Sequence, residues 1–228
     1  KALRLLAGRP MVLRIADRLR LATKLDAVVA TVPTGDANNR LAKILERDGI
    51  ECVRGPENNI VERLRLVAER TLAGALVRIT ADCPFVEPSL VDAAIIRWHA
   101  GPMMSNTFPS NNPYDYVSNV FPKRTYPDGL DTEVFDRNLV ESLARSPDPD
   151  RMVSPSSWLW AHPEAMRHGS LSHNPDLSAL RWTVDTADDL ACAEIMFRRL
   201  PEGFTMDDVL AEFGPRASFG PGEIVQAR

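Results

Sequence analysis

The stretch Ala75-Leu-Val-Arg-Ile-Thr-Ala-Asp-Cys-Pro-Phe85 sets the expectation for the fold. Its branched and aliphatic residues from Leu76 to Thr80 predict a short buried strand, which ends near Asp82 and is closed by Pro84. In an open α/β sheet, ligands bind at the carboxyl ends of the strands, so a carboxylate in this position is expected to face a cleft. From this stretch alone it is equally open that Asp82 only begins a turn or caps the next helix.

A second stretch, Leu180-Arg-Trp-Thr-Val-Asp-Thr-Ala-Asp-Asp-Leu190, repeats the same order. A short apolar strand is predicted to end at Asp185, and a helix over 187–199 is predicted to follow with Thr186 as its N-cap. Carboxylate oxygens are the ligands that Mg²⁺ prefers, and Mg²⁺ in turn suits phosphates. We therefore expect Asp82 and Asp185 to converge on one metal, with their carboxylates within roughly 4–7 Å of each other.

Strand and helix signals alternate along most of the chain, with short loops between them. This alternation is typical of an α/β protein with a mainly parallel sheet covered on both faces. We expect one domain over residues 1–228. Strands are expected at 27–32, 50–53, 76–80, 114–120, 134–135 and 182–184, and helices at 10–22, 38–47, 60–71, 89–98, 136–144, 187–199 and 204–213, while 152–160 is ambiguous.

The composition narrows the function classes. Apolar residues make up 44% of the 228 residues, and the formal net charge is −4. There is no basic stripe with interleaved aromatic residues, which argues against a nucleic-acid partner, and no apolar run long enough for a membrane span. Three widely spaced cysteines argue against a disulfide framework or a zinc site and predict a reducing, cytoplasmic setting.

Several short blocks occur together in a specific order, although each is weak alone. On these blocks the chain resembles the cytidylyltransferase-like family of spore coat polysaccharide biosynthesis protein F and, more distantly, the synthetases that make CMP-activated acidic sugars. The blocks are Lys1-Ala-Leu, Gly8-Arg-Pro-Met11, Val29-Ala-Thr31, Val53-Arg-Gly55, Arg78-Ile-Thr-Ala-Asp-Cys-Pro84, Tyr116-Val-Ser-Asn119, Tyr126-Pro-Asp-Gly-Leu-Asp131 with Glu133, and Leu180-Arg-Trp-Thr-Val-Asp185.

The resemblance implies a three-layer, Rossmann-like nucleotidyltransferase fold of the nucleotide-diphospho-sugar transferase type. It implies an enzyme that moves CMP from CTP to a small acidic or phosphorylated sugar-type acceptor and releases pyrophosphate, in the synthesis of surface polysaccharides or glycoconjugates. It also implies Mg²⁺ on the acids that match Asp82 and Asp185, where the metal would neutralise phosphate charge. The resemblance leaves a homodimer open.

The two ends of the sequence match the start of the family pattern. In the family the first strand runs into Gln-Ala-Arg, then a phosphate-binding loop, then a lysine. Here Glu223-Ile-Val-Gln-Ala-Arg228 closes the sequence and Lys1 opens it. We expect 223–228 to be that strand, in a chain that is permuted or given out of order, with Gln226, Ala227, Arg228 and Lys1 beside the nucleotide phosphates. The alternative is that 223–228 is an unrelated tail.

The resemblance also suggests roles for individual side chains. Arg78 is expected to touch phosphate, although a structural ion pair is an equal alternative, and Asp128-Gly129 could equally be an ordinary turn. The expected catalytic residues are Lys1, Arg228 and Asp82; Arg78 and Asn58 join the nucleotide site; and Tyr126, Asp128, Asp131 and Glu133 are expected to bind the acceptor.

The chain departs from the family pattern in three places. Asn58-Asn59 replaces an acidic pair, Asp150-Arg-Met-Val153 replaces an Arg-Glu-His-Val block, and 102–113 has the character of an insertion. Two other functions therefore stay open at this point. One is a glycosyltransferase of related fold, although Asp82-Cys-Pro lacks the second acid of an Asp-x-Asp pair, and the other is a catalytically silent binding or assembly module.

Overall fold

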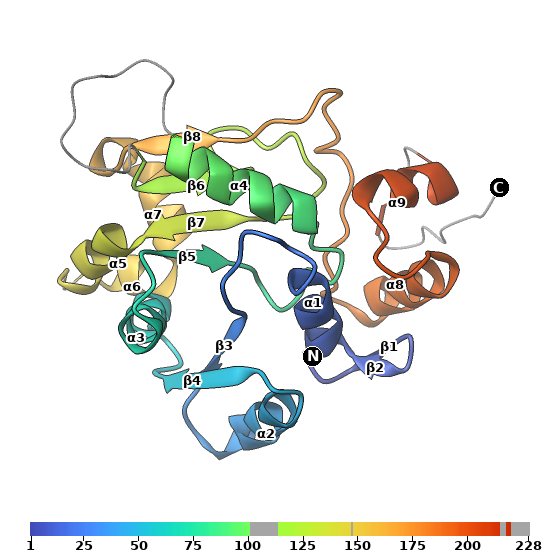
Figure 1. Ribbon diagram of the computed structural model, residues 1–228, viewed down its shortest axis with the longest axis horizontal. Helices are drawn as coiled ribbons and strands as arrows, with labels where there is room; N and C mark the ends of the chain where they lie inside the picture. The colour runs from blue at the N-terminus through green and yellow to red at the C-terminus, as the bar shows by residue number, and fades with distance from the viewer. Residues whose placement is uncertain (101–113, 147, 215–217, 220–228) are drawn as a thin grey trace.

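The structure is a computed structural model that describes residues 1–100, 114–146, 148–214 and 218–219. Helices surround the strands, and two C-terminal helices, α8 (Ala187–Arg199) and α9 (Met206–Phe213), lie together at one end (Figure 1). Expectations for 102–113 and 223–228 lie outside the described residues. Within the described residues, no helix combines the length and the apolar character needed to cross a membrane.

The largest sheet has four strands in the order β5-β7-β6-β8. β7 runs antiparallel to both β5 and β6, whereas β6 and β8 are parallel. A separate parallel pair joins β3 to β4, and a short antiparallel pair joins β1 to β2. The sheet is therefore more mixed than the mainly parallel sheet that the sequence predicts, because β7 is inserted between β5 and β6 in the opposite direction. The strands are β1 (Leu5–Leu6), β2 (Arg9–Pro10), β3 (Val29–Pro33), β4 (Glu51–Gly55), β5 (Ala75–Arg78), β6 (Tyr116–Ser118), β7 (Glu133–Asp136) and β8 (His168–Ser170).

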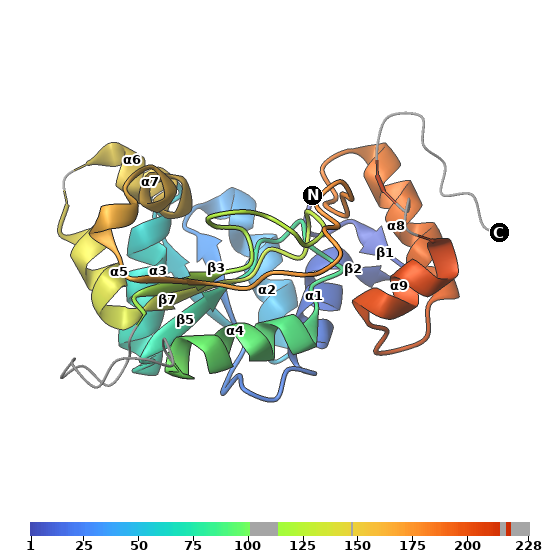
Figure 2. The ribbon, with the colours of Figure 1, turned by 90° about the horizontal axis from the view of Figure 1, so that it is seen from above.

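Helices cover both faces of the four-stranded sheet, and the alternation of side chains along each strand explains how (Figure 2). Val117 and Val134 face α4 and pack with Ala94 and Trp98. Their neighbours Tyr116 and Phe135 face the opposite way, into a cluster with α3, α5 and α7. The remaining helices are α1 (Met11–Leu19), α2 (Asn39–Arg47), α3 (Ile60–Thr71), α4 (Pro88–Ala100), α5 (Arg137–Ala144), α6 (Pro149–Val153) and α7 (Pro155–Ala161), with 3-10 turns at Asp36–Asn38 and Pro163–Ala165.

A second apolar cluster lies under α8 and α9. The buried rings of Phe85 and Trp182 have centroids 5.9 Å apart, and Phe85 also contacts Phe219 at 5.7 Å. Both helices begin with a capping box in which a threonine and an aspartate exchange hydrogen bonds, at Thr186 and Thr205. This packing holds the segment before α8 against the loop that follows β5.

Most of the helices expected from the sequence are present, and α3 and α8 have the expected bounds. The predicted strand at 182–184 is wrong. That segment forms no strand ladder, because its backbone bonds go to loops on both sides: Trp182 N–H donates to the Asp128 carbonyl at 2.6 Å and Val184 N–H to the Asp82 carbonyl at 2.8 Å. The ambiguous stretch 152–160 belongs to α6 and α7.

Candidate active site

The structure brings together the two acids expected to bind a metal. The bond from Val184 N–H to the Asp82 carbonyl ties the two chain segments side by side, one residue before Asp185. Lys1 Nζ lies 3.2 Å from Asp82 Oδ2 and 2.7 Å from Asp185 Oδ1. Because both oxygens contact one nitrogen, they are at most about 6 Å apart. Three predicted site residues thus form one cluster, although they are far apart in the sequence.

Charge keeps all three groups of this cluster ionised. Burial alone would raise the pKa of Asp82, but hydrogen bonding from Thr80 and the nearby Lys1 ammonium outweigh it and lower that pKa. A hydrogen bond from Lys1, supported by Arg181, lowers the pKa of Asp185. Desolvation opposes the charge on Lys1, yet hydrogen bonds and charge from the two aspartates raise its pKa overall. At neutral pH the cluster holds two carboxylates around one cation.

The donor set of the cluster fits a hard divalent cation such as Mg²⁺. Asp82 and Asp185 offer carboxylate oxygens on either side of a position that already attracts a positive charge, the Lys1 ammonium. Among residues 1–100, 114–146, 148–214 and 218–219, no group of three or more His, Cys, Asp or Glu side chains could hold a metal. A two-carboxylate site is nevertheless typical of Mg²⁺, which takes its other ligands from water and substrate phosphates.

Arg181 and Asp189 support this cluster, and the sequence analysis did not assign them to it. Arg181 donates to Asp185 at 3.0 Å and forms two bonds to Asp189, at 2.9 and 3.0 Å. Asp189 also accepts from the backbone N–H groups of Asp185 and Thr186 at 2.9 and 2.8 Å. The Arg181 pair and these backbone bonds lower the pKa of Asp189 strongly, although its burial opposes them. No local signal in the sequence marked Arg181, because the segment 181–185 is not helical and its partners are brought together by the fold.

The expected acceptor loop lies against the same segment. Asp128 N–H donates to the Leu180 carbonyl at 2.9 Å. A Cβ on Gly129 would lie 2.7 Å from the backbone carbon of Trp182, so only glycine allows this close approach. Arg124 pairs with Asp131 through two bonds, one of them 2.8 Å long, and with Asp128 at 3.4 Å. Burial raises the pKa of Asp128, and the charges of Asp131 and Asp185 add to that rise.

Glu133 belongs to a different, buried polar group. It accepts a hydrogen bond from the Tyr116 hydroxyl at 2.6 Å and pairs with Arg78. Trp160 Nε1–H donates to the same hydroxyl at 3.1 Å. The structural ion pair that the sequence analysis left open for Arg78 is therefore present, with its side chain only 23% exposed. Arg78 and Glu133 are held by one another in this structure.

The other expected residues lie at or near the edge of these groups. Tyr126 is half-buried with its ring 5.3 Å from His173, and Asn58 is exposed in the turn before α3. The adjacent Asn59 caps α3 by accepting from Glu62 N–H at 2.8 Å. Gln226, Ala227 and Arg228 lie outside the described residues. Cys83 is buried, and burial raises its pKa well above the usual value, which does not suit a thiolate nucleophile.

Sequence comparison decides the family. The family model of the MobA-like NTP transferase domain matches residues 1–158, a range that includes Lys1, Asp82 and the loop at 126–131. The chain belongs to this family of nucleotidyltransferases. The resemblance to cytidylyltransferase-like proteins noted in the sequence is confirmed by the relatives and solved structures described next.

Two curated proteins illustrate the sequence similarity. The chain is 25% identical over 160 residues to spore coat polysaccharide biosynthesis protein SpsF of Bacillus subtilis, an alignment covering 68% of this chain and 60% of that protein. It is 34% identical over 97 residues to 3-deoxy-manno-octulosonate cytidylyltransferase of Geobacter sulfurreducens, covering 42% of this chain and 37% of that enzyme. The chain thus spans less than two thirds of the length of each of these two relatives.

Solved structures confirm the nucleotidyltransferase fold. A cytidylyltransferase from Leptospira borgpetersenii superposes with a TM-score of 0.81 at 20% identity, covering 92% of this chain and 85% of that chain. A molybdopterin-guanine dinucleotide biosynthesis protein A from Archaeoglobus fulgidus superposes with a TM-score of 0.56 at 16% identity, covering 88% and 91%. At these identities the likeness establishes the fold and leaves the substrate open.

Proposed function

We propose that this protein is a Mg²⁺-dependent cytidylyltransferase that moves CMP from CTP to a small acidic or phosphorylated sugar-type acceptor and releases pyrophosphate. The observation that carries the proposal is the cluster of Lys1, Asp82 and Asp185, a cation between two carboxylates in a nucleotidyltransferase fold. The choice of cytidine rests on the named cytidylyltransferases among the similar proteins. A role in surface polysaccharide synthesis rests on the similarity to SpsF.

In the proposed reaction, an acceptor oxygen attacks the α-phosphorus of CTP. The bond from that phosphorus to the bridging oxygen breaks, and pyrophosphate leaves with the electron pair. A hydroxyl acceptor loses its proton to solvent, whereas an anionic phosphate acceptor has none to lose. Asp82 and Asp185 would hold Mg²⁺, which when bound neutralises charge on phosphate oxygens.

The residues of the chain orient and balance charge around this step. Lys1 places a permanent positive charge next to both acids, where it would stabilise the negative charge that develops on the leaving pyrophosphate. Arg181 and Asp189 hold Asp185 in place through the bonds described above. Arg124 is held against the loop by Asp128 and Asp131, and an acidic acceptor would bind through this guanidinium.

The test is pyrophosphate release from the purified protein with Mg²⁺, each of the four ribonucleoside triphosphates and a panel of acidic sugars and sugar phosphates. We expect release with CTP and one class of acceptor. Asp82→Asn and Asp185→Asn should each lower turnover by roughly 100-fold, as for loss of a major electrostatic stabiliser. Asp188→Asn is the matched control, because this exposed acid of α8 is not part of the cluster. The proposal would be refuted if none of the four triphosphates gave pyrophosphate release, or if all three variants had equal turnover. Faster turnover with ATP or GTP than with CTP would refute the nucleotide assignment.

A further inference from the structure

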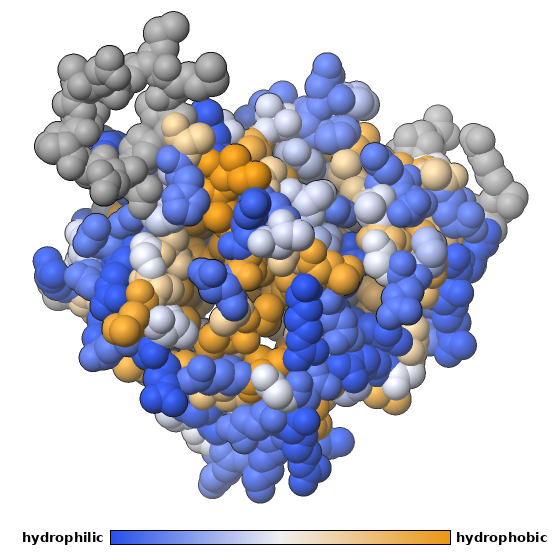
Figure 3. Space-filling model, in the orientation of Figure 1, coloured by the Kyte–Doolittle hydropathy of each residue, from blue (hydrophilic) through white to orange (hydrophobic). Residues whose placement is uncertain are grey.

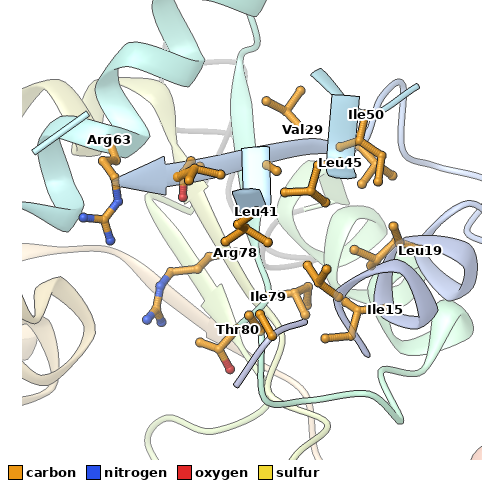
Figure 4. A pocket seen from close by; sticks show the side chains of 18 of the residues that line it. Ile15, Leu19, Val29, Leu41, Leu45, Ile50, Arg63, Arg78, Ile79 and Thr80 are labelled. Carbon is orange, nitrogen blue, oxygen red and sulfur yellow. The ribbon is translucent and has the colours of Figure 1, made fainter. Parts of the chain in front are cut away.

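Two arginine side chains lie at one end of a cavity of about 320 Å³ that is bordered by β3 and β5. In the space-filling view, hydrophobic side chains border a hollow near the middle of the molecule (Figure 3). Arg63, near the start of α3, and Arg78, the last residue of β5, both line the cavity. Their guanidinium groups lie to the same side, away from Ile15 and Leu19 of α1 (Figure 4). The arginines therefore give a mostly apolar hollow one positively charged end.

The stem of Arg63 is fixed against the end of β4. A Cβ on Gly55, the last residue of β4, would lie 2.8 Å from Arg63 Cγ, so only glycine leaves room for this stem. Arg63 Nη1 donates to the carbonyls of Pro56 and Glu57, at 2.6 and 2.7 Å. These bonds hold the guanidinium in one place. Its Nε is buried and has no hydrogen-bond partner among the described residues.

Arg78 is also held by one edge of its guanidinium. Its Nη1 pairs with Glu133 and lies 3.4 Å from the Ser156 hydroxyl. Because both contacts use the same nitrogen, the other edge of this group has no partner in the described part of the chain. A guanidinium carries five N–H donors, so each of the two arginines keeps donors that can bind a ligand.

The positive charge of this arginine pair is not balanced within the structure. Desolvation and the charge of Arg78 lower the pKa of Arg63, and the exposed Glu57 opposes them only in part. Among the described residues, no carboxylate forms an ion pair with Arg63, and Glu133 is taken up by Arg78. Two half-buried cations that lie close together repel each other, and an anion bound by both would relieve the repulsion and satisfy their unused donors.

We propose that Arg63 and Arg78 form an anion-binding site for a carboxylate or phosphate group, separate from Arg124 and from the cluster of Lys1, Asp82 and Asp185. Guanidinium groups recognise both kinds of anion through paired hydrogen bonds. The site shares no residue with the charged groups already described, so its ligand is an additional acidic group. The inference rests on the two arginines and their surroundings and does not depend on the proposed chemistry.

The site lies where a ligand of the enzyme can reach it. Gly55 ends β4 and Arg78 ends β5, and ligands of open α/β sheets bind at the carboxyl ends of the strands. Thr80 lines the same cavity, and its hydroxyl lies 3.1 Å from Cys83 Sγ, so the site adjoins the loop that carries Asp82. Two reactants can supply an anion there: a second acidic group of the acceptor, or a phosphate of the nucleotide.

Isothermal titration calorimetry with inorganic phosphate, and with acetate as the carboxylate probe, tests the site on the full chain. We expect the unmodified protein to bind phosphate, and Arg63→Gln to weaken that binding by roughly 10-fold or more. Gly55→Ala should have a similar effect, because it displaces the Arg63 stem without removing a charge. The matched controls are Arg70→Gln, in the last turn of the same helix, and Gly74→Ala, where no atom lies within 4 Å of the added Cβ.

The source of the anion is measured by titrating the unmodified and Arg63→Gln proteins with CTP and with sugars that carry one or two acidic groups. Weaker binding of the two-acid sugars alone would support the site and assign it to the acceptor. Weaker binding of CTP would support the site and assign it to a nucleotide phosphate.

Two results would overturn the proposal. The first is the absence of phosphate and acetate binding in the unmodified protein. The second is equal phosphate binding in the Arg63→Gln and Arg70→Gln proteins. Because the phosphate titrations contain no nucleotide and measure no turnover, a failure of pyrophosphate release would refute the proposed function and leave the anion site supported.

Discussion

Replacing Gly129 by alanine tests how the acceptor loop is held against the segment that carries Asp185. The added Cβ would lie 2.7 Å from the backbone carbon of Trp182 and 2.8 Å from the backbone nitrogen of Thr183. Both contacts are with backbone, so no side chain can rotate away to relieve them. The loop would have to move, and with it the carbonyl of Asp128 that accepts from Trp182 N–H.

The expected loss of folding free energy has two parts, and a control variant separates them. Gly129 has a φ of +106°, and an alanine with a left-handed backbone costs roughly 1–2 kcal/mol. Forcing extra volume into a packed position costs about 1–3 kcal/mol more. Gly203→Ala is the matched control, since its φ is also positive, at +72°, but its nearest neighbour is a Leu21 methyl group at 3.9 Å.

The assay is urea unfolding of the three proteins, with the midpoint and slope compared. We expect Gly203→Ala to lower the free energy of unfolding by roughly 1–2 kcal/mol and Gly129→Ala by about 2–5 kcal/mol. Equal losses in the two variants would show that the close approach of the loop to Trp182 is not a constraint. The loop would then be positioned by contacts other than its approach to Trp182.

Two further predictions follow from the charged groups of the site. The pKa values of Asp82 and Asp185 are lowered in the folded protein, so their pairing with Lys1 stabilises the fold above the unfolded pKa of about 3.9, and this stabilisation is lost as pH falls through the folded pKa values. We expect the free energy of unfolding to decline below about pH 4 less steeply in Lys1→Met than in the unmodified protein. An equal decline in the two proteins would contradict the pairing. Asp189→Asn should destabilise the fold by roughly 1–3 kcal/mol, because Arg181 loses a buried partner but stays about one-third exposed. Thermal unfolding measures this loss of stability. A loss no larger than that of Asp188→Asn would show that Asp189 does not support the cluster.

The sequence predicted the parts of the site that depend on local signals. Thr186 and Asp189 have the spacing of a capping box, so the start of α8 was predicted correctly. The convergence of Asp82 with Asp185 was expected from acids at the ends of two apolar runs. The structure brings them together by a different route, since 182–184 is not a strand and a single backbone bond to the Asp82 carbonyl aligns the segments.

The parts that the sequence missed depend on contacts between distant segments. The sequence around Arg124 and Arg181 does not show whether these arginines form ion pairs or are simply exposed, because the fold determines which acid lies beside each of them. The direction of β7 has the same origin: an apolar run shows that a strand is buried and does not show which way it runs beside β5. β8 is three residues long with a central glycine, Gly169, which gives no periodic signal.

The cavity between β3 and β5 connects the fold to the site in physical terms. Lys1 and Asp82 adjoin two residues that line this cavity, Ala2 and Ala81, and Lys1 in turn pairs with Asp185. An edge strand with free backbone groups on one side opens more readily than a strand paired on both sides. The precision of a two-carboxylate metal site depends on rigid support, because its donor atoms must hold a near-ideal geometry. The chain segments around this cavity therefore support the active-site cluster as well as the core.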